Sequence, residues 1–353
     1  MHYPHLAKES QTLMASTPSS RPSPEHIFAT LNAHQQTAAL KTAIELDLFS
    51  VIDEGNHRCR EIAKRLNASD RGVRILCDFL TVLGFLRKED ERYSLSEDAA
   101  LFLSKRSPHY MGTIAEFLTD EQHHENLAHL ADAVRRGGTA TGRGNNLEPN
   151  DRLWVSFARS MAPLTVPTAI YIAQLVGAPE LGAIRVLDIA AGHGMYGITI
   201  AQQNPKAQIT AVDWPAVLEV AKENAAKAGV ALRYTARPGS AFEAELGDSY
   251  DLVLLTNIFH HFDKETCVQL MRRAHQALKP DGRAVTLEFV PNEDRVSPPR
   301  EAAFSLLMLV GTDAGDAYTF SEYKAMFQEA GFADTTIHRI PGMPQEVLLS
   351  QKS

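Results

Sequence analysis

The sequence predicts an α/β fold in which a doubly wound, mostly parallel sheet follows an N-terminal domain of the all-helical or winged-helix kind. Two observations predict it. From residue 182 onward, short apolar runs alternate with helical stretches, which is the pattern of parallel strands joined by crossover helices. Before that point apolar residues recur at helical spacing. A chain of 353 residues is also longer than a domain with one hydrophobic core usually is. We therefore expect two domains.

Composition argues against several classes of protein. A net charge of −8 disfavours general nucleic-acid binding, and no apolar run reaches the length of a membrane span. The N-terminus is rich in Ser, Thr and Pro and lacks the apolar core of a secretory signal, so residues 1–22 are expected to be a disordered tail. The three cysteines are scattered, without metal or disulfide spacing. We expect a cytoplasmic protein that binds neither nucleic acid nor membrane.

The N-terminal domain is expected over residues 23–108. A helical pattern runs from His26 to Phe49, and a second covers residues 59–66. After a turn, Ser69 or Asp70 can cap a third helix that ends at Leu83. The run GFLRKEDERYSLSEDA then indicates two short strands around a charged turn. Helix, helix–turn–helix and hairpin in this order are typical of a winged-helix module.

A winged helix can bind DNA or another protein chain. Residues 57–105 hold ten Lys or Arg against eight Asp or Glu, which is not a basic surface. The helix in the recognition position carries Arg71 and Arg74 but is otherwise mostly apolar. These observations favour dimerisation with a second copy over DNA binding.

Five strands are expected in the second half of the chain. They cover residues 185–191, 208–213, 231–236, 250–257 and 282–290, with helices between them such as 215–228 and 264–278. Ligands of such sheets bind outside the carboxyl ends of the strands, so candidate site residues are those where each strand stops.

The first strand ends in VLDIAAGHGMYG, whose glycines fit the GxGxxG dinucleotide fingerprint. Asp188 argues against a nicotinamide dinucleotide, because a carboxylate in an apolar strand needs a cationic partner and repels a pyrophosphate. A ligand with an ammonium and a sulfonium but no phosphate suits this acid. We infer S-adenosyl-L-methionine (SAM), contacted by Asp188, Gly192 and Gly194, with NAD as the alternative.

The next two strand ends carry further candidates. Asp213 lies 21 residues past Gly192, where it can accept hydrogen bonds from both ribose hydroxyls of an adenosine. It could also cap the helix that begins at Pro215. At the third strand end, Gly239 and Ser240 could border the adenine.

The fourth strand ends in NIFHHFD, where His260 and His261 are adjacent. Neighbours on an extended chain point to opposite faces, so two imidazoles placed there are not expected to share one role.

Together these motifs resemble the small-molecule O-methyltransferases, a family that includes caffeate, acetylserotonin and bacterial polyketide O-methyltransferases. The resemblance runs from about residue 25 to the C-terminus and includes the loop DIAAGHG, the acid in AVDWP, the GSAF loop and the histidine after the fourth strand. It implies a seven-stranded class I methyltransferase sheet with a final antiparallel strand within Glu346–Gln351. It also implies a domain over 109–353, in which residues 109–180 border the acceptor pocket and 181–353 form the Rossmann-like core.

The resemblance implies roles for individual residues. His260 takes the position of the general base, Glu288 is the acid that orients it, and His261 points elsewhere as packing or support. Thr165 matches a hydroxyl near the carboxylate of the cofactor. The other expected cofactor contacts are Trp214, Ala241, Phe242 and Asn257, and the expected acceptor contacts are Phe157, Met161, His124 and Met308. The implied activity is methyl transfer from SAM to a phenolic or enolic hydroxyl of a secondary metabolite, by a homodimer.

The sequence departs from the family pattern at several positions. Ala190 and Ala191 replace the first two glycines of the loop, and Ser240 stands where plant members have an acid. Ala317 replaces a second flanking acid, with Asp316 one residue away. C-methylation or a non-methylating reaction on the same fold is therefore kept as an alternative. A winged-helix transcription regulator and an NAD-dependent oxidoreductase are less favoured.

Two other segments bear on the acceptor. DEQHHENLAHL contains HExxxH, one residue longer than the zinc motif HExxH, so no metal site is expected there; His124 could instead contact the acceptor. The run PPREAAFSLLMLVGT is expected to form an apolar helix that places Met308 toward the acceptor pocket and the dimer contact.

Overall fold

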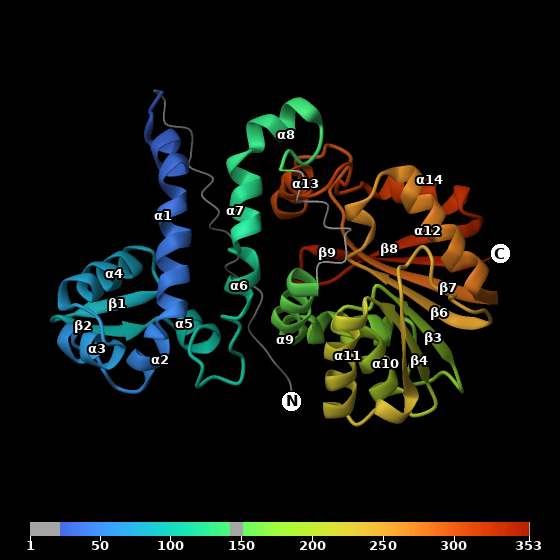
Figure 1. Cartoon of the computed structure of the whole chain (residues 1–353), viewed down its shortest axis with the longest axis horizontal. Helices are drawn as coiled ribbons and strands as arrows, with labels where there is room; N and C mark the ends of the chain where they lie inside the picture. The colour runs from blue at the N-terminus through green and yellow to red at the C-terminus, as the bar shows by residue number, and fades with distance from the viewer. Residues whose placement is uncertain (1–21, 142–150, 353) are drawn as a thin grey trace. The chain divides into compact units, whose positions relative to one another are not determined.

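The computed structural model describes residues 22–141 and 151–352 and divides the chain into two compact units, Met1–Tyr110 and Met111–Ser353 (Figure 1). Except for Pro22, the tail predicted over residues 1–22 lies outside the described residues. Each unit is described on its own.

The first unit is helical with one hairpin, in the predicted order. The long helix predicted from His26 to Phe49 is two helices, because Asp47 adopts a left-handed φ of 59° and its carboxylate accepts a bond from Ser50 Oγ at 2.6 Å. Ser69 caps α4, as one of the two predicted alternatives. The elements are α1 (Glu25–Glu45), α2 (Leu48–Asp53), α3 (Cys59–Leu66), α4 (Asp70–Val82), β1 (Leu86–Glu89), β2 (Arg92–Leu95) and α5 (Glu97–Phe102).

The second unit contains the sheet, and the predicted fold class is confirmed. The strand order is β5-β4-β3-β6-β7-β9-β8, in which β9 is antiparallel to both of its neighbours and the other pairs are parallel. The order reverses between β3 and β6, which is where open α/β sheets bind ligands. The strands are β3 (Arg185–Ile189), β4 (Gln208–Asp213), β5 (Tyr234–Pro238), β6 (Tyr250–Thr256), β7 (Leu278–Phe289), β8 (Phe332–Arg339) and β9 (Gln345–Lys352).

Three strands differ from the prediction. β7, predicted from residue 282, begins four residues earlier at Leu278. The segment predicted as a strand over 231–236 begins with a 3-10 helix, η1 (Ala231–Arg233), and only then becomes β5. β8 was not located from the sequence, because it is an edge strand whose residues FADTTIHR are mostly polar and exposed. Edge strands need no continuous apolar pattern.

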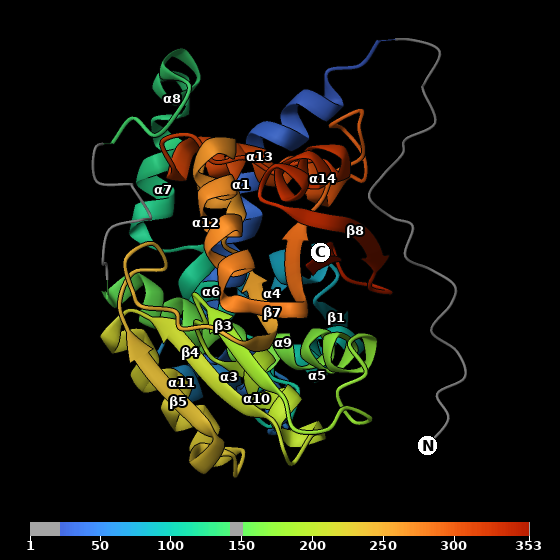
Figure 2. The same ribbon diagram turned by 90° about the vertical axis from the view of Figure 1, so that its right-hand side faces the viewer.

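Helices cover both faces of the sheet (Figures 1 and 2). One apolar core lies between the sheet and α9 (Asp151–Leu175), α10 (Met195–Gln203) and α11 (Pro215–Lys227). The other lies between the sheet and α12 (Lys264–Ala277) and α14 (Phe320–Glu329). The remaining helices of this unit are α6 (Ile114–Leu118), α7 (Glu121–Ala128), α8 (Leu130–Arg136) and α13 (Pro299–Gly311). Among the described residues, none of the helices combines the length and the apolar character that crossing a membrane requires.

Candidate active site

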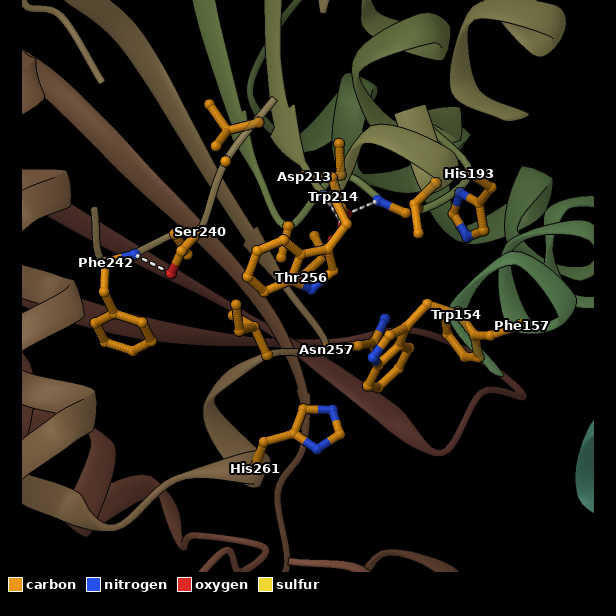
Figure 3. Close-up of a pocket in the computed structure, with 18 of the residues that line it drawn as sticks. Trp154, Phe157, His193, Asp213, Trp214, Ser240, Phe242, Thr256, Asn257 and His261 are labelled. Carbon is orange, nitrogen blue, oxygen red and sulfur yellow. Dashed lines mark hydrogen bonds between the residues drawn. The ribbon is translucent and has the colours of Figure 1, made fainter. Parts of the chain in front are cut away.

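A cavity of about 260 Å³ opens beyond the carboxyl ends of β3, β4, β5 and β6 (Figure 3). Nine residues predicted as cofactor or acceptor contacts line it: Phe157, Gly192, Asp213, Trp214, Gly239, Ser240, Ala241, Phe242 and Asn257. Sequence reasoning did not single out several others that line it, among them Trp154, His193, Tyr196 and Phe262. Trp154 lies on α9 and not at a strand end, so no strand-end motif points to it.

The loop after β3 turns sharply enough to need left-handed residues. Ala190, Gly192 and Gly194 have φ values of 54°, 56° and 74°. A Cβ on Gly194 would lie 2.5 Å from the Tyr234 hydroxyl, so glycine is required there for space as well as for conformation. Gly194 is the N-cap of α10 and does not itself line the cavity.

Asp213 joins the glycine loop to the end of β4. One carboxylate oxygen accepts a bond from the Gly192 N–H and the other from the Trp214 N–H, both at 2.7 Å. Burial raises the pKa of Asp213 to about 6. The N-cap of α11 is Trp214, so Asp213 does not cap that helix in the alternative predicted way. Its side chain lines the cavity and keeps free lone pairs, since a carboxylate can accept about four bonds.

Asp188 lies away from the cavity. It is fully buried in β3, and neither carboxylate oxygen has a hydrogen-bond partner among the described residues. Burial raises its pKa to about 8; nearby Asp213 adds to this, whereas the Gly197 N–H opposes it without reaching hydrogen-bond geometry. Its side chain lies against α10, where a Cβ on Gly197 would be 3.1 Å from Asp188 Oδ2, and it does not line the cavity. The contact with a cofactor ammonium stays a prediction.

The loop after β5 lines the cavity on another side. Gly239 has a φ of 146°, a value that side chains disfavour. Ser240 Oγ accepts a bond from the Phe242 N–H at 3.2 Å, and Phe242 meets Phe262 edge-on with ring centroids 5.0 Å apart. This wall is therefore aromatic and apolar, with a single hydroxyl.

His260 and Glu288 form a buried pair. Glu288, at the end of β7, places Oε2 at 2.6 Å from His260 Nδ1, and its Oε1 accepts bonds from the N–H groups of Ile258 and Phe259 at 2.9 and 2.8 Å. The Phe304 ring, on α13, is nearly perpendicular to the His260 ring, and the two ring centroids lie 4.9 Å apart. The carboxylate thus fixes both the imidazole and the turn that carries it.

The expectation that His261 points elsewhere is wrong. Residues 259–261 form a 3-10 helix, η2, so neighbouring side chains do not alternate between faces as they would on extended chain. The rings of His260 and His261 lie 4.3 Å apart, and His261 lines the cavity with its ring against Trp154 (Figure 3). Burial, and then the neighbouring His260, hold the pKa of His261 well below its usual value.

Several other predicted contacts do not line this cavity. His124 is exposed on α7, and its Nδ1 pairs with the backbone carbonyl of Asp120. Met308 is buried within α13, and Met161 is half-buried on α9. Thr165 is buried, and its hydroxyl is bonded to His193 and to the Met161 carbonyl. His260 itself does not line the cavity, but the next residue in sequence, His261, does.

Asp316 is bound to another partner. Its Oδ2 pairs with Arg295 at 3.0 Å, and Arg295 also binds Glu322. The ring contacts of His260 are with Phe289, Phe304 and His261, and Asp316 is not among its bonded partners. Asp316 therefore does not take the place of a second carboxylate against the imidazole.

The fold and the strand-end site are those of a methyltransferase, and the chain belongs to the O-methyltransferase family. The model of the O-methyltransferase domain matches residues 127–333, and that of the O-methyltransferase dimerisation domain matches residues 28–105. The second match indicates self-association.

Particular relatives span nearly the whole chain. It is 30% identical to the 3-hydroxy-5-methyl-1-naphthoate 3-O-methyltransferase of Streptomyces sahachiroi, over 85% of this chain and 86% of that one. A solved putative O-methyltransferase from Nostoc punctiforme is 46% identical, with a TM-score of 0.90 over 94% of this chain and 100% of the other. Human N-acetylserotonin methyltransferase, solved with SAM, shares the fold at 22% identity, with a TM-score of 0.81 over 95% and 99% of the two chains.

Proposed function

We propose that this chain transfers a methyl group from SAM to a phenolic or enolic hydroxyl of a small molecule, with His260 as the general base. The observation that carries this proposal is the buried His260–Glu288 pair. The next residue in sequence, His261, lines the cavity at the carboxyl ends of the strands.

The residues of the cavity fit an adenosine-containing cofactor. Asp213 offers free carboxylate lone pairs suited to ribose hydroxyls, and Trp214 and Phe242 offer aromatic faces suited to a base. A volume of about 260 Å³ suits a small molecule rather than a polymer. When bound, SAM supplies the electrophilic methyl group. The structure of the human relative in complex with SAM supports this assignment.

The base must be supported because the proton transfer is uphill. A phenol has a pKa near 10 and an imidazole near 6.5, so complete transfer costs about 5 kcal/mol. Glu288 accepts a hydrogen bond from Nδ1–H of His260, which leaves Nε2 to take the proton of the acceptor hydroxyl as the new C–O bond forms. The adjacent carboxylate stabilises the imidazolium that results.

An aromatic acceptor fits the surroundings of the base. Phe289 and Phe304 stack at 3.9 Å, and both rings lie against His260. The relative from Streptomyces sahachiroi is named for methylation of a naphthoate hydroxyl, which is an acceptor of this class. A secondary metabolite with an aromatic hydroxyl is therefore the acceptor that we favour.

We also propose a homodimer formed through the first unit. Its helix α1 exposes Ile27, Phe28 and Leu31 at 60%, 60% and 66% in the single chain. An apolar face of this kind is typical of a surface that another chain covers.

The function can be tested with a panel of phenols, naphthols and enols and labelled SAM, combined with mass spectrometry of whatever copurifies. We expect SAM-dependent O-methylation of at least one aromatic hydroxyl. Labelled methyl groups found only on carbon would replace this conclusion with C-methylation. Tight NADH binding by calorimetry without SAM binding would replace it with an oxidoreductase.

A further inference from the structure

His193 connects the glycine loop to three helices. It lines the cavity and is nearly buried, with its ring between α9 and α10. Its Nδ1 accepts a bond from the Met195 N–H at 3.1 Å, and its Nε2 lies 2.9 Å from Thr165 Oγ1 on α9. Its carbonyl accepts a bond from Asn224 on α11 at 3.0 Å.

The hydrogen bonds define the protonation state of this ring. Thr165 Oγ1 donates its one proton to the Met161 carbonyl at 2.9 Å, so the bond to His193 must be donated by Nε2–H. Nδ1 then has to be unprotonated, because it accepts from the Met195 N–H. His193 is therefore a neutral imidazole with its proton on Nε2. Burial, which lowers its pKa to about 4, agrees with this state.

The same contacts set the position of the α9 wall of the cavity. The Phe157 ring stacks on His193 at 6.5 Å with an interplanar angle of 17°, and Trp154 meets Phe157 edge-on at 5.9 Å. Phe157 and Trp154 both line the cavity (Figure 3). Thr165, by contrast, does not line it.

We propose that His193 and Thr165 form a latch that holds α9 against the glycine loop and so positions the Trp154–Phe157 wall for the cofactor. Thr165 is then a positioning residue that acts through His193, instead of bonding to the cofactor as the family resemblance implies. This inference rests on the proposed function, since it concerns the same cavity.

A double-mutant cycle tests the latch, with S-adenosyl-L-homocysteine binding measured by calorimetry. Thr165→Val keeps the shape of the side chain and removes the hydroxyl, while His193→Phe keeps the ring and removes both bonds. Each should weaken binding about tenfold, since each leaves a buried polar group unpaired. Because both variants break one latch, the double variant should be no more than about threefold weaker than His193→Phe. Thr165→Ser, which keeps the hydroxyl, should stay within about threefold of the wild type.

A second readout does not need the cofactor. The chain has two tryptophans, so Trp214→Phe leaves Trp154 as the only tryptophan, whose emission is selected by excitation at wavelengths that tyrosine does not absorb. In that background Thr165→Val should increase quenching of the Trp154 emission by acrylamide about twofold or more, at a temperature where circular dichroism shows the variant folded, and Thr165→Ser should not. If His193→Phe does not fold, His193→Asn, which is too short to reach Thr165, completes the cycle.

Three results would overturn the latch: fully additive losses of about a hundredfold in the double variant, full affinity in Thr165→Val, or unchanged Trp154 quenching in that variant. The first would mean that Thr165 contacts the cofactor directly. If the wild-type enzyme binds neither SAM nor S-adenosyl-L-homocysteine, the proposed function fails, and the quenching experiment still decides the latch.

Discussion

His260 Nδ1 and Glu288 Oε2 lie 2.6 Å apart, and the other oxygen of that carboxylate holds the two preceding N–H groups of the turn. One fully buried side chain therefore orients the imidazole and also shapes the 3-10 turn that brings His261 to the cavity wall. The two histidines have different roles because they have different partners.

His260→Gln is expected to lower kcat by about 10²–10⁴, because a positioned base contributes that range. SAM affinity should stay unchanged, and the pH–rate profile should lose its acidic limb. Glu288→Gln should reduce kcat less, since the base remains. Steady-state kinetics with SAM binding by calorimetry provides the check. Near-wild-type turnover in His260→Gln would mean that the reaction is not assisted by this base.

His261→Gln is the matched control for the neighbouring imidazole. Because His261 lines the cavity without pairing with Glu288, its replacement should act mainly on KM and reduce kcat less than about tenfold. A larger loss of kcat than in His260→Gln would reverse the assignment of the base.

Asp213→Ala is expected to weaken SAM binding at least about tenfold. The variant loses a charged acceptor for ribose hydroxyls, worth roughly 1.5–3 kcal/mol per bond, together with the bond to the Gly192 N–H of the glycine loop and the bond to the Trp214 N–H. Calorimetry on the folded variant measures the loss, with circular dichroism as the control for structure. Undiminished affinity would rule out Asp213 as a ribose ligand.

Asp188 should make the stability of the cofactor-free protein depend on pH. Its pKa is raised from 3.8 to about 8, so folding takes up a proton between these values. Stability therefore falls as pH rises through that interval and is lowest above about 8. Between pH 5.5 and 8 the free energy of unfolding, measured with urea, should fall by about 2–3 kcal/mol less in Asp188→Asn than in the wild type. Equal slopes in the two proteins would show that Asp188 is ionised across this range.

Ala190→Gly is expected to stabilise the protein by about 0.5–1 kcal/mol. Ala190 has a φ of 54°, which costs a non-glycine residue about 1–2 kcal/mol, partly offset by the extra chain entropy of glycine. Ala191→Gly is the matched control: Ala191 has no positive φ and is buried, so this variant should lose about 1 kcal/mol. Thermal melting of both variants gives the comparison, and stabilisation by both or by neither contradicts the strain argument.

Charges on the exposed face of α1 should disrupt self-association. Phe28→Glu combined with Leu31→Glu replaces two exposed apolar side chains, and light scattering should then report a smaller species. Leu232→Glu is the control, because Leu232 is fully exposed in the second unit. A double variant that keeps the mass of the wild type would place the dimer interface elsewhere.

Local patterns were sufficient for much of the fold. Both ends of β4 and the start of α11 were predicted, because an apolar run stops at Asp213 and proline is favoured at the first position of a helix, which Pro215 occupies. Ser69 and the charged hairpin turn were likewise readable from residue type. The edge strand β8 was not, because its stability comes from pairing with β9 and not from an apolar pattern of its own.

The sequence by itself determined which strand ends carry polar residues, and so indicated Asp213, the glycine loop and the pair His260–His261, while the family resemblance added Glu288 and the choice of His260 as the base. Only the tertiary structure decided which side chains reach the cavity. Asp188 is turned toward α10, and Thr165 is bonded to His193 across 28 residues of chain. His261 reaches the cavity because Glu288, about 30 residues later, holds the preceding turn in a 3-10 conformation. Contacts between residues so far apart in the chain leave no periodic signal, since periodicity reports only the local backbone.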